Sequence, residues 1–391
     1  MKILFISPHY RSFLQVQGGG EQRTYLFIKA LTMFADVDFL AFHSAAGFDE
    51  LPINVVYQQD VCDDVKSSKL QKWLPVFKFW DTKALFPVSE SRADIVQKIV
   101  QETDYDLIVT HYIPRAMEFD LLRYARKLWI DVDDLPEDKF LWMAKSATSR
   151  SSRIRYWLLS KIAKIHTKAI VKKIQKATFP NPNVVENCQG VYLPNIPFYS
   201  TTCTAADFKR VEKRIFFVGS LGYKPNYMGI NYFLENIYPL LLKKQPDTQF
   251  YIAGTMDQND TAFERWTAYP NVHLLGFVDD LQAEYEKSRV VLVPIYNGAG
   301  TNIKVVEALQ MNRACAVSEF VTRGFSIFFE DKKDYFVAHS NEEYIEILDK
   351  LLTDEKLNNQ TAENGRKKVQ QHFSFAAFAA KVKEIFISID C

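Results

Sequence analysis

The sequence predicts an α/β protein built from two Rossmann-like domains. Its 391 residues exceed what one hydrophobic core usually contains. Short apolar runs alternate with helical patterns, which is typical of βαβ units and parallel sheets. A stretch rich in Pro, Ser and Thr, residues 193–206, interrupts this alternation. We therefore expect domains over residues 1–195 and 207–372, followed by a C-terminal helix over residues 373–391.

The first domain is expected to begin with a buried strand at residues 3–7. This apolar run is too short for the core of a signal peptide, and no small-residue cleavage site follows it. Further strands are expected at 37–42, 55–57, 107–110 and 129–132, with helices at 21–34, 93–102 and 115–127.

The second domain repeats this alternation. Strands are expected at 215–218, 249–253, 272–275, 290–293 and 314–318, and helices at 227–244, 279–287 and 302–311. Open α/β sheets bind ligands at the carboxyl ends of their strands, so functional residues are expected there.

Composition excludes several classes of protein. The formal charge of +1 indicates no bulk attraction to nucleic acid. The five cysteines, at positions 62, 188, 203, 315 and 391, form no C-x-x-C pair, which favours a reducing compartment over a disulfide framework or a zinc site. No run approaches the roughly 20 apolar residues that span a bilayer. We expect a cytoplasmic protein, with peripheral association at the inner face of the membrane as a further hypothesis.

Residues 291–318 are the most informative segment. They predict a strand, a Gly-containing turn at 297–302, an amphipathic helix and a second strand. Free N–H groups at a helix N-terminus, next to a glycine that lets the backbone approach closely, make an anion site. Lys304 and Glu307 lie three residues apart on one helix face. This combination suits a nucleotide diphosphate, with Lys304 for phosphate charge and Glu307 for ribose hydroxyls.

Residues 298–309 read G-x-G-T-N-x-K-x-x-E-A-L, and a predicted strand follows them. This motif resembles the donor site of retaining glycosyltransferases of the GT-B fold, family 4 type. Counterparts of other family motifs occur upstream in the same order, at 217–220, 225–226, 252–254 and 275–280, and the family's first loop resembles residues 18–21. The resemblance covers most of residues 1–390 and is most specific from 215 to 318.

The resemblance implies a GT-B architecture, in which two Rossmann-like domains face each other across a cleft and the C-terminal helix returns to the N-terminal domain. It implies a donor site in the second domain, formed by Gly219, Ser220, Lys224, Asn226, Gly254, Phe277, Val278, Gly300, Thr301, Asn302, Lys304 and Glu307. The loop Gly18, Gly19 and Gly20 is expected near the donor phosphates and the acceptor, although a Gly-rich loop alone is a weak signal. No metal cofactor is expected, because Lys304, Lys224 and the helix N-terminus can stabilise the leaving diphosphate.

Three positions depart from the family pattern. Many members carry E-x7-E, but the counterpart of the first Glu here is Ala299 or Asn297, depending on alignment. Ser220 stands where Arg usually follows the glycine of the phosphate loop, and Lys224 is a candidate to compensate. Asn312 replaces the Gly after the Glu-bearing helix, and asparagine tolerates that helix end.

Two polar features of the first domain have open interpretations. His111 follows a predicted strand and resembles the family's histidine that contacts the transferred sugar; a structural role is equally consistent with its position. With Lys304 and Glu307 it completes the expected catalytic set. The aspartates Asp131, Asp133 and Asp134 could orient an acceptor hydroxyl, bind a metal or cap the following helix.

A basic segment completes the candidates. From residue 139 to residue 185 there is no Asp or Glu, while Lys and Arg recur. Ile154, Leu158, Ile162, Ile165 and Ala169 follow helical spacing, with Trp157 beside them. A basic amphipathic helix over residues 150–176 suits an anionic membrane surface. An ordinary helix with its apolar stripe on the core is the alternative, and nothing resembles a nucleic-acid-binding module.

These features and the family resemblance predict a glycosyltransferase that moves a sugar from a nucleotide-diphosphate sugar to a glycan or lipid-linked acceptor in cell-surface polysaccharide synthesis. The resemblance implies that the anomeric configuration is retained. Two alternatives stay open. A sugar-nucleotide epimerase or hydrolase of the same fold would act without an acceptor. A non-catalytic nucleotide-sugar binder would bind nucleotide without turnover, as the departures at Ala299 and Ser220 suggest.

Overall fold

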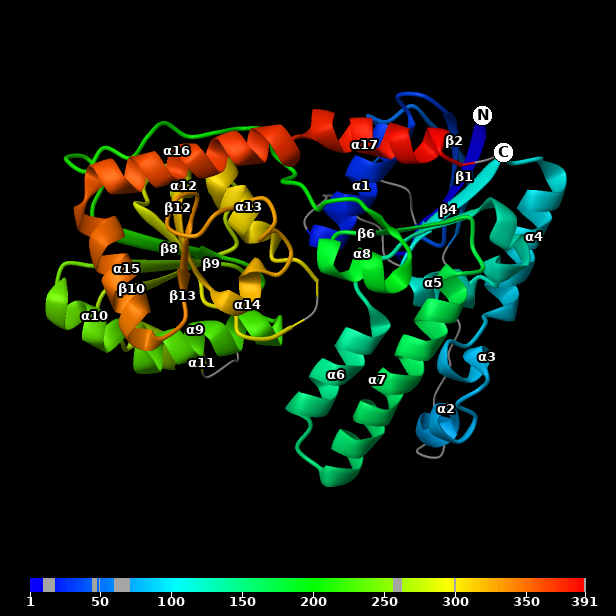
Figure 1. Ribbon diagram of the computed structural model, residues 1–391, viewed down its shortest axis with the longest axis horizontal. Helices are drawn as coiled ribbons and strands as arrows, with labels where there is room; N and C mark the ends of the chain where they lie inside the picture. Colours follow the sequence, from blue (N-terminus) through cyan, green and yellow to red (C-terminus); the bar gives the residue numbers. More distant parts are fainter. Residues whose placement is uncertain are drawn as a thin grey trace. The chain divides into compact units, whose positions relative to one another are not determined.

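The computed structural model describes residues 1–9, 18–43, 48, 50–59, 71–255, 262–298 and 300–389. Ala299, Cys62 and Cys391, which the sequence analysis names, lie outside the described residues. The chain divides into two compact units, Met1–Pro194 with Phe378–Cys391, and Asn195–Ala377. Each unit contains a parallel sheet with helices packed against it, which confirms the predicted α/β fold class (Figure 1).

The first unit has a seven-stranded sheet in the order β3-β2-β1-β4-β5-β6-β7. Its strands are β1 (Lys2–Ile6), β2 (Asp36–Ala41), β3 (Ile53–Gln58), β4 (Leu107–His111), β5 (Leu128–Asp131), β6 (Lys176–Phe179) and β7 (Val191–Tyr192). Ile3 pairs with Val37 on one side and with Leu107 on the other, both in parallel register. The chain therefore adds β2 and β3 on one side of β1, and then continues with β4 on the other side.

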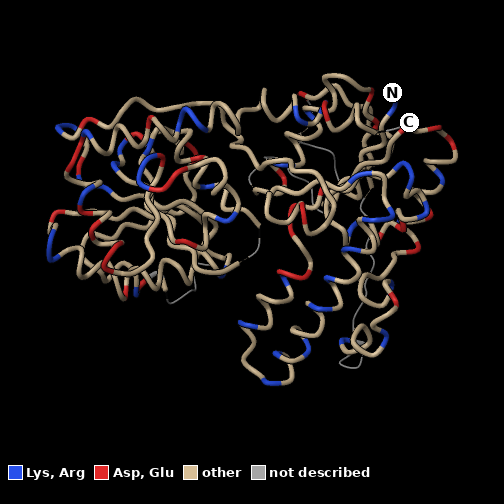
Figure 2. Tube along the Cα trace, in the orientation of Figure 1, with Lys and Arg blue, Asp and Glu red and all other residues tan. Residues whose placement is uncertain are grey.

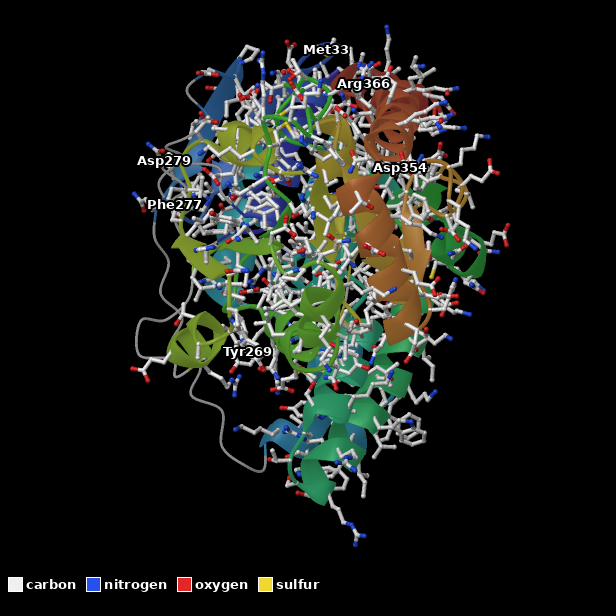
Figure 3. All side chains as sticks on the ribbon, turned by 90° about the vertical axis from the view of Figure 1, so that its left-hand side faces the viewer. Met33, Tyr269, Phe277, Asp279, Asp354 and Arg366 are labelled. Atoms are coloured by element: carbon white, nitrogen blue, oxygen red, sulfur yellow. The ribbon has the colours of Figure 1, made fainter. Side chains whose placement is uncertain are left out.

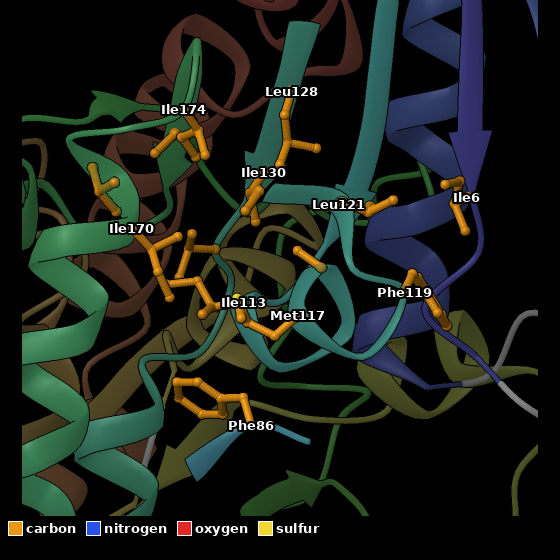
Figure 4. Close-up of a cluster of buried hydrophobic side chains, with 14 of the residues drawn as sticks. Ile6, Phe86, Ile113, Met117, Phe119, Leu121, Leu128, Ile130, Ile170 and Ile174 are labelled. Carbon is orange, nitrogen blue, oxygen red and sulfur yellow. The ribbon is translucent and has the colours of Figure 1, made fainter. Parts of the chain in front are cut away.

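The helices of this unit cover the sheet and extend from it. They are α1 (Gly19–Leu31), η1 (Gln71–Trp73), α2 (Leu74–Phe77), α3 (Thr82–Leu85), α4 (Glu90–Glu102), α5 (Ile113–Glu118), η2 (Leu121–Lys127), α6 (Pro136–Ser146), α7 (Arg150–Val171) and α8 (Pro182–Cys188), with α17 (Phe375–Ile387). Figure 4 shows Ile130 of β5, Met117 of α5 and Ile170 of α7 in one buried cluster. Burial of these side chains from water anchors the C-terminal half of α7 in the core.

The last helix belongs largely to the first unit. The rings of Phe378 and Phe27 lie edge to face, with their centroids 6.4 Å apart. Those of Phe386 and Phe34 are 5.0 Å apart. Lys176 donates a hydrogen bond of 3.1 Å to the Ser388 hydroxyl. These contacts hold α17 against α1 and the strand β6.

The second unit has a six-stranded sheet in the order β10-β9-β8-β11-β12-β13. Its strands are β8 (Arg214–Val218), β9 (Gln249–Ala253), β10 (Val272–Gly276), β11 (Val290–Val293), β12 (Ala314–Ser318) and β13 (Phe336–Ala338). Its helices are α9 (Lys224–Asn236), α10 (Tyr238–Lys244), α11 (Ala262–Thr267), α12 (Leu281–Glu286), α13 (Ile303–Gln310), α14 (Glu319–Thr322), α15 (Asn341–Thr353) and α16 (Glu355–His372). β11 is buried throughout, as expected for a central parallel strand.

Two predicted helices are each divided in the structure. The helix expected at 115–127 is α5 followed by η2, because Asp120 between them has a positive φ of 53°. The helix expected at 227–244 is α9 followed by α10, and Pro239 in the first turn of α10 cannot donate the backbone hydrogen bond of a continuous helix. Among the described residues, no helix combines the length and apolar character needed to cross a bilayer.

Candidate functional site

The segments singled out in the second half of the sequence meet at the carboxyl edge of the second sheet. Gly219 directly follows β8, and residues 294–302 connect β11 to α13. β8 and β11 pair with each other at the middle of the sheet. From β8 the chain continues to β9 and β10 on one side, and from β11 it continues to β12 and β13 on the other. Open α/β sheets bind ligands at such a switch point.

Lys304 is held beside the loop after β8. Its Nζ donates a hydrogen bond of 2.9 Å to Asn226 Oδ1, and Asn226 Nδ2 donates one of 2.8 Å to the Ser220 carbonyl. A Cβ on Gly219 would lie 2.8 Å from Asn226 Nδ2 and 3.3 Å from Lys304 Cε. Only glycine leaves room for this arrangement, so the ammonium group is fixed next to the loop.

The ammonium group of Lys304 is largely shielded from water. Burial lowers the pKa of Lys304 to about 8, and the nearby carboxylate of Glu307 opposes this only in part. Burial also raises the pKa of Glu307, while the Tyr285 hydroxyl donates to its Oε1 at 3.3 Å. A desolvated cation of this kind is stabilised by a bound anion.

The turn before α13 is held by its surroundings. Arg323 Nη2 donates to the carbonyls of Gly298 and Gly300 at 3.1 and 3.3 Å. Asn195 donates to the Thr301 hydroxyl at 2.7 Å. Asn302 is the N-cap of α13 and makes no side-chain cap hydrogen bond. The turn thus presents the start of α13 in a defined geometry.

Two of the backbone N–H groups near the start of α13, where an anion site was predicted, already donate hydrogen bonds within the chain. The N–H of Ile303 donates to the Thr301 carbonyl at 2.9 Å, and that of Val305 donates to the Asn302 carbonyl at 3.1 Å. These two groups are therefore not available to an anion, and the cation of Lys304 becomes the more important component of the site.

The other predicted donor residues lie along the same edge. A Cβ on Gly254, after β9, would lie 2.0 Å from the Gly219 carbonyl, so the two loops touch through their backbones. Phe277 and Val278 follow β10, and Phe277 is exposed at the surface in Figure 3. Lys224 is the first residue of α9 and has an exposed side chain.

In the first unit, His111 lies in a buried cluster of polar side chains. Its Nδ1 lies 3.0 Å from the Thr24 hydroxyl, and its Nε2 lies 3.3 Å from Asp131 Oδ2. Arg23 donates to both oxygens of Asp131, at 2.6 and 2.8 Å. His111 and Asp131 have no exposed surface. Burial lowers the pKa of His111 to about 3, so the ring is neutral near pH 7.

This network corrects the predicted exposure of two residues. His111 was expected to face a substrate, but as the last residue of β4 it is enclosed by α1 and β5. Asp131 cannot contact an acceptor directly, because Arg23 takes up its carboxylate. Asp133 Oδ1 lies 4.0 Å from Arg23 Nε, and Asp134 is exposed. The capping interpretation is wrong, since Leu135 is the N-cap of α6.

The Gly-rich loop leads into α1. Gly18 is the N-cap, its N–H donates to Glu21 Oε2 at 3.1 Å, and Gly19 and Gly20 open the helix. A Cβ on Gly20 would lie 2.5 Å from the Tyr112 hydroxyl. Gly20 therefore has a packing role, whatever its relation to a ligand. Tyr112 itself adopts a φ of 66°, which is uncommon for a residue with a side chain.

Sequence reasoning missed several contributors. His9 follows β1 at the same sheet edge as His111, and its Nε2 lies 3.0 Å from the Thr24 hydroxyl. Its position after a strand was a usable signal. Tyr285 and Arg323 carried no such signal, because their partners are distant in sequence. Among the described residues, no group of three or more His, Cys, Asp or Glu side chains is placed to bind a metal ion.

Part of the chain is similar in sequence to known proteins. Residues 212–354 match the family model described as "Glycosyl transferases group 1". A protein from Klebsiella pneumoniae, described as an uncharacterized 44.6 kDa protein in the cps region, is 21% identical over 221 residues. That alignment covers 54% of this chain and 56% of the relative, so the chain matches only about half of the relative's length.

Solved structures resemble the whole chain. A sucrose-phosphate synthase from Thermosynechococcus elongatus is 15% identical, with a TM-score of 0.68 over 99% of this chain and 98% of that one. A TarM variant from S. aureus, solved with fondaparinux, α-GlcNAc-glycerol and UDP, is 11% identical, with a TM-score of 0.68 over 99% of this chain and 100% of that one. At these identities the likeness concerns the fold. The match to the group 1 glycosyl transferase model, over residues 212–354, lies within the second unit and includes Lys304 and Glu307.

Proposed function

We propose that this protein transfers a sugar, with retention of anomeric configuration, from a nucleotide-diphosphate sugar to a glycan or lipid-linked acceptor. One observation carries the proposal: the partly desolvated Lys304, held by Asn226 beside Gly219 at the switch point of the second sheet. Stabilising the charge that develops on a leaving diphosphate is the main electrostatic task of such a reaction. We assign this task to Lys304, and the scheme requires no metal.

The remaining components of the proposal come from the family and from the relatives. Glu307, one turn along α13 from Lys304, is proposed to bind ribose hydroxyls. The K. pneumoniae relative in a cps region suggests a role in cell-surface polysaccharide synthesis. An acceptor linked to lipid agrees with peripheral membrane association through residues 150–176. The TarM complex with UDP supports a nucleotide as part of the donor.

Nucleotide binding provides the direct test. The purified protein is heated with UDP, GDP, ADP, CMP and their common sugar conjugates, and the unfolding midpoint is measured. A ligand at about 100 times its dissociation constant adds about 2.7 kcal/mol to the free energy of unfolding. We expect one nucleotide to raise the midpoint selectively. Absence of a shift with every nucleotide would contradict the donor site.

Turnover then separates the alternatives. Release of nucleotide only in the presence of a glycan or lipid-linked acceptor supports transfer. Release without an acceptor, or formation of an epimer, supports the epimerase or hydrolase. Binding with no turnover under any condition supports a non-catalytic binder.

The affinity for that nucleotide should depend on pH. Lys304 binds a diphosphate as a cation, and in the free protein its pKa is about 8. Above this pH the lysine must take up a proton on binding, so affinity is expected to fall by about tenfold between about pH 7 and about pH 9. Titration calorimetry measures this directly. A Lys304→Gln variant should bind more weakly and lose the pH dependence; an unchanged profile in that variant would assign the effect to another group.

A further inference from the structure

The segment Leu74–Trp80 leaves its largest side chains exposed. Phe77 and Trp80 are each 68% exposed, and Phe79 is 57% exposed. The rings of Phe79 and Trp80 contact each other, with centroids 5.1 Å apart. Val76 of the same segment packs against the core cluster of the first unit. One apolar side thus holds the segment in place, while the aromatic side chains face solvent.

This segment is attached to α7. The Phe79 carbonyl lies 2.9 Å from His166 Nε2, which must be the donor because a carbonyl only accepts. His166 Nδ1 then accepts a hydrogen bond from the Thr82 hydroxyl, at 2.8 Å. His166 is buried in α7. Figure 1 shows α2 and α3 beside α7, so the segment Leu74–Trp80 and α7 are neighbours in the fold.

The exposed face of α7 combines apolar and basic side chains. Ile162 is buried with Leu159, whereas Ile154, Trp157 and Ile165 are exposed. The single apolar stripe predicted from the sequence is therefore wrong, since its members are divided between core and surface. Lys161 lies over the Trp157 ring, 5.6 Å from its centroid. Lys and Arg recur along α6 and α7 in Figure 2.

Apolar side chains exposed next to one another mark an interaction surface. The charge indicates its partner. Residues 139–185 contain no Asp or Glu, although the chain as a whole has a formal charge of only +1. The excess of positive charge is therefore local. Aromatic side chains beside Lys and Arg suit the interface of a membrane that contains anionic lipids.

We propose that Leu74–Trp80 and the exposed face of α7 form one docking surface for an anionic lipid bilayer. Phe77, Phe79 and Trp80 insert between the headgroups, and Lys and Arg of α7 bind the lipid phosphates. The inference extends the membrane association of the proposed function and rests on that function only for the identity of the acceptor. Binding to lipid itself needs neither donor nor acceptor.

Vesicle sedimentation tests the proposal. The full chain is mixed with vesicles of phosphatidylcholine alone or of phosphatidylcholine with phosphatidylglycerol, at low and high salt. We expect binding only to the anionic vesicles, and weaker binding at high salt because exposed charges are screened. The triple variant Arg153→Gln, Lys161→Gln, Lys164→Gln should bind about a hundredfold more weakly, since each surface cation contributes several-fold. The variant Phe77→Ser, Phe79→Ser, Trp80→Ser should lose about tenfold or more.

Matched variants control for general effects. Lys209→Gln, Lys243→Gln, Lys244→Gln removes three exposed cations of the second unit, and Met33→Ser, Ile327→Ser removes two exposed apolar side chains elsewhere. Both should bind vesicles as the wild type does. Failure of the wild type to bind anionic vesicles at low salt overturns the proposal. So does binding that the two docking variants leave unchanged, or self-association without vesicle binding, which identifies a second copy of this chain as the partner.

The nucleotide experiment keeps the two proposals separate. A protein that responds to a nucleotide but not to vesicles retains the donor site and loses the docking surface. One that binds vesicles but no nucleotide retains the surface and loses the proposed function.

Discussion

The substitutions Lys304→Ala and Glu307→Ala are each expected to lower turnover about a hundredfold or more, as found when one electrostatic contact to a transition state is removed. Lys304→Ala removes the cation that Asn226 holds beside Gly219. Glu307→Ala removes the carboxylate proposed to bind ribose. Initial rates with the nucleotide sugar identified by thermal unfolding provide the measurement.

The two variants should differ in their effects on substrate binding. Loss of the Lys304 charge acts most strongly as the diphosphate leaves, so the decrease is expected mainly in kcat. Loss of the Glu307 carboxylate is expected to lower kcat and also to raise KM, because a ribose contact helps to hold the donor before the reaction as well as during it. Lys243→Ala, an exposed lysine on α10, is the matched control and should keep normal rates. Near-normal rates for Lys304→Ala and Glu307→Ala would remove both residues from the mechanism.

Arg23→Met is expected to lower the free energy of unfolding by about 3–5 kcal/mol, the usual effect of removing one partner from a buried ion pair. Arg23 and Asp131 are both buried, and the guanidinium donates to both carboxylate oxygens. Without Arg23 the carboxylate keeps the hydroxyl of Thr178 but loses its counter-charge. The same arginine also donates to the Pro194 carbonyl, at the end of the first unit. Chemical denaturation measures the change.

A second substitution separates the cost of an unpaired charge from the loss of packing. Arg23→Met with Asp131→Leu removes both charges, so it should recover a substantial part of the lost stability. Lys127→Met is the surface control. Its partner Asp104 is almost fully exposed, and such pairs contribute about 0–1 kcal/mol. An Arg23→Met variant no less stable than Lys127→Met would show that the buried pair does not stabilise the fold.

The repeating pattern of the sequence was sufficient to predict most strands of both sheets. The strand expected at 249–253 is β9, and that expected at 290–293 is β11, because buried parallel strands are short runs of apolar residues between polar turns. The strands β6, β7 and β13 were not predicted. β6 has the sequence KATF, in which buried Thr178 is satisfied by Trp129 and Asp131 rather than by water. A polar residue satisfied by distant partners interrupts the apolar pattern.

Some residues of the candidate site could also be predicted from the sequence, and others could not. The motif around Lys304 and Glu307 could be identified from local spacing, because both residues lie on one turn of a single helix. The contact of Lys304 with Asn226 joins residues 78 positions apart, so spacing could not reveal it. The enclosure of His111 was also missed, since its partners Thr24 and Asp131 come from α1 and β5.

By itself, the sequence determined the α/β class, most of the strands and the position of the donor motif, because apolar periodicity and turn residues act over a few neighbouring positions. Only the tertiary structure decided which polar side chains are exposed and which are buried in pairs. It placed His111 and Asp131 beneath the surface and Phe77 and Trp80 upon it. Burial depends on contacts between segments far apart in the chain, and these same contacts set the hydration, and hence the pKa, of each charged group.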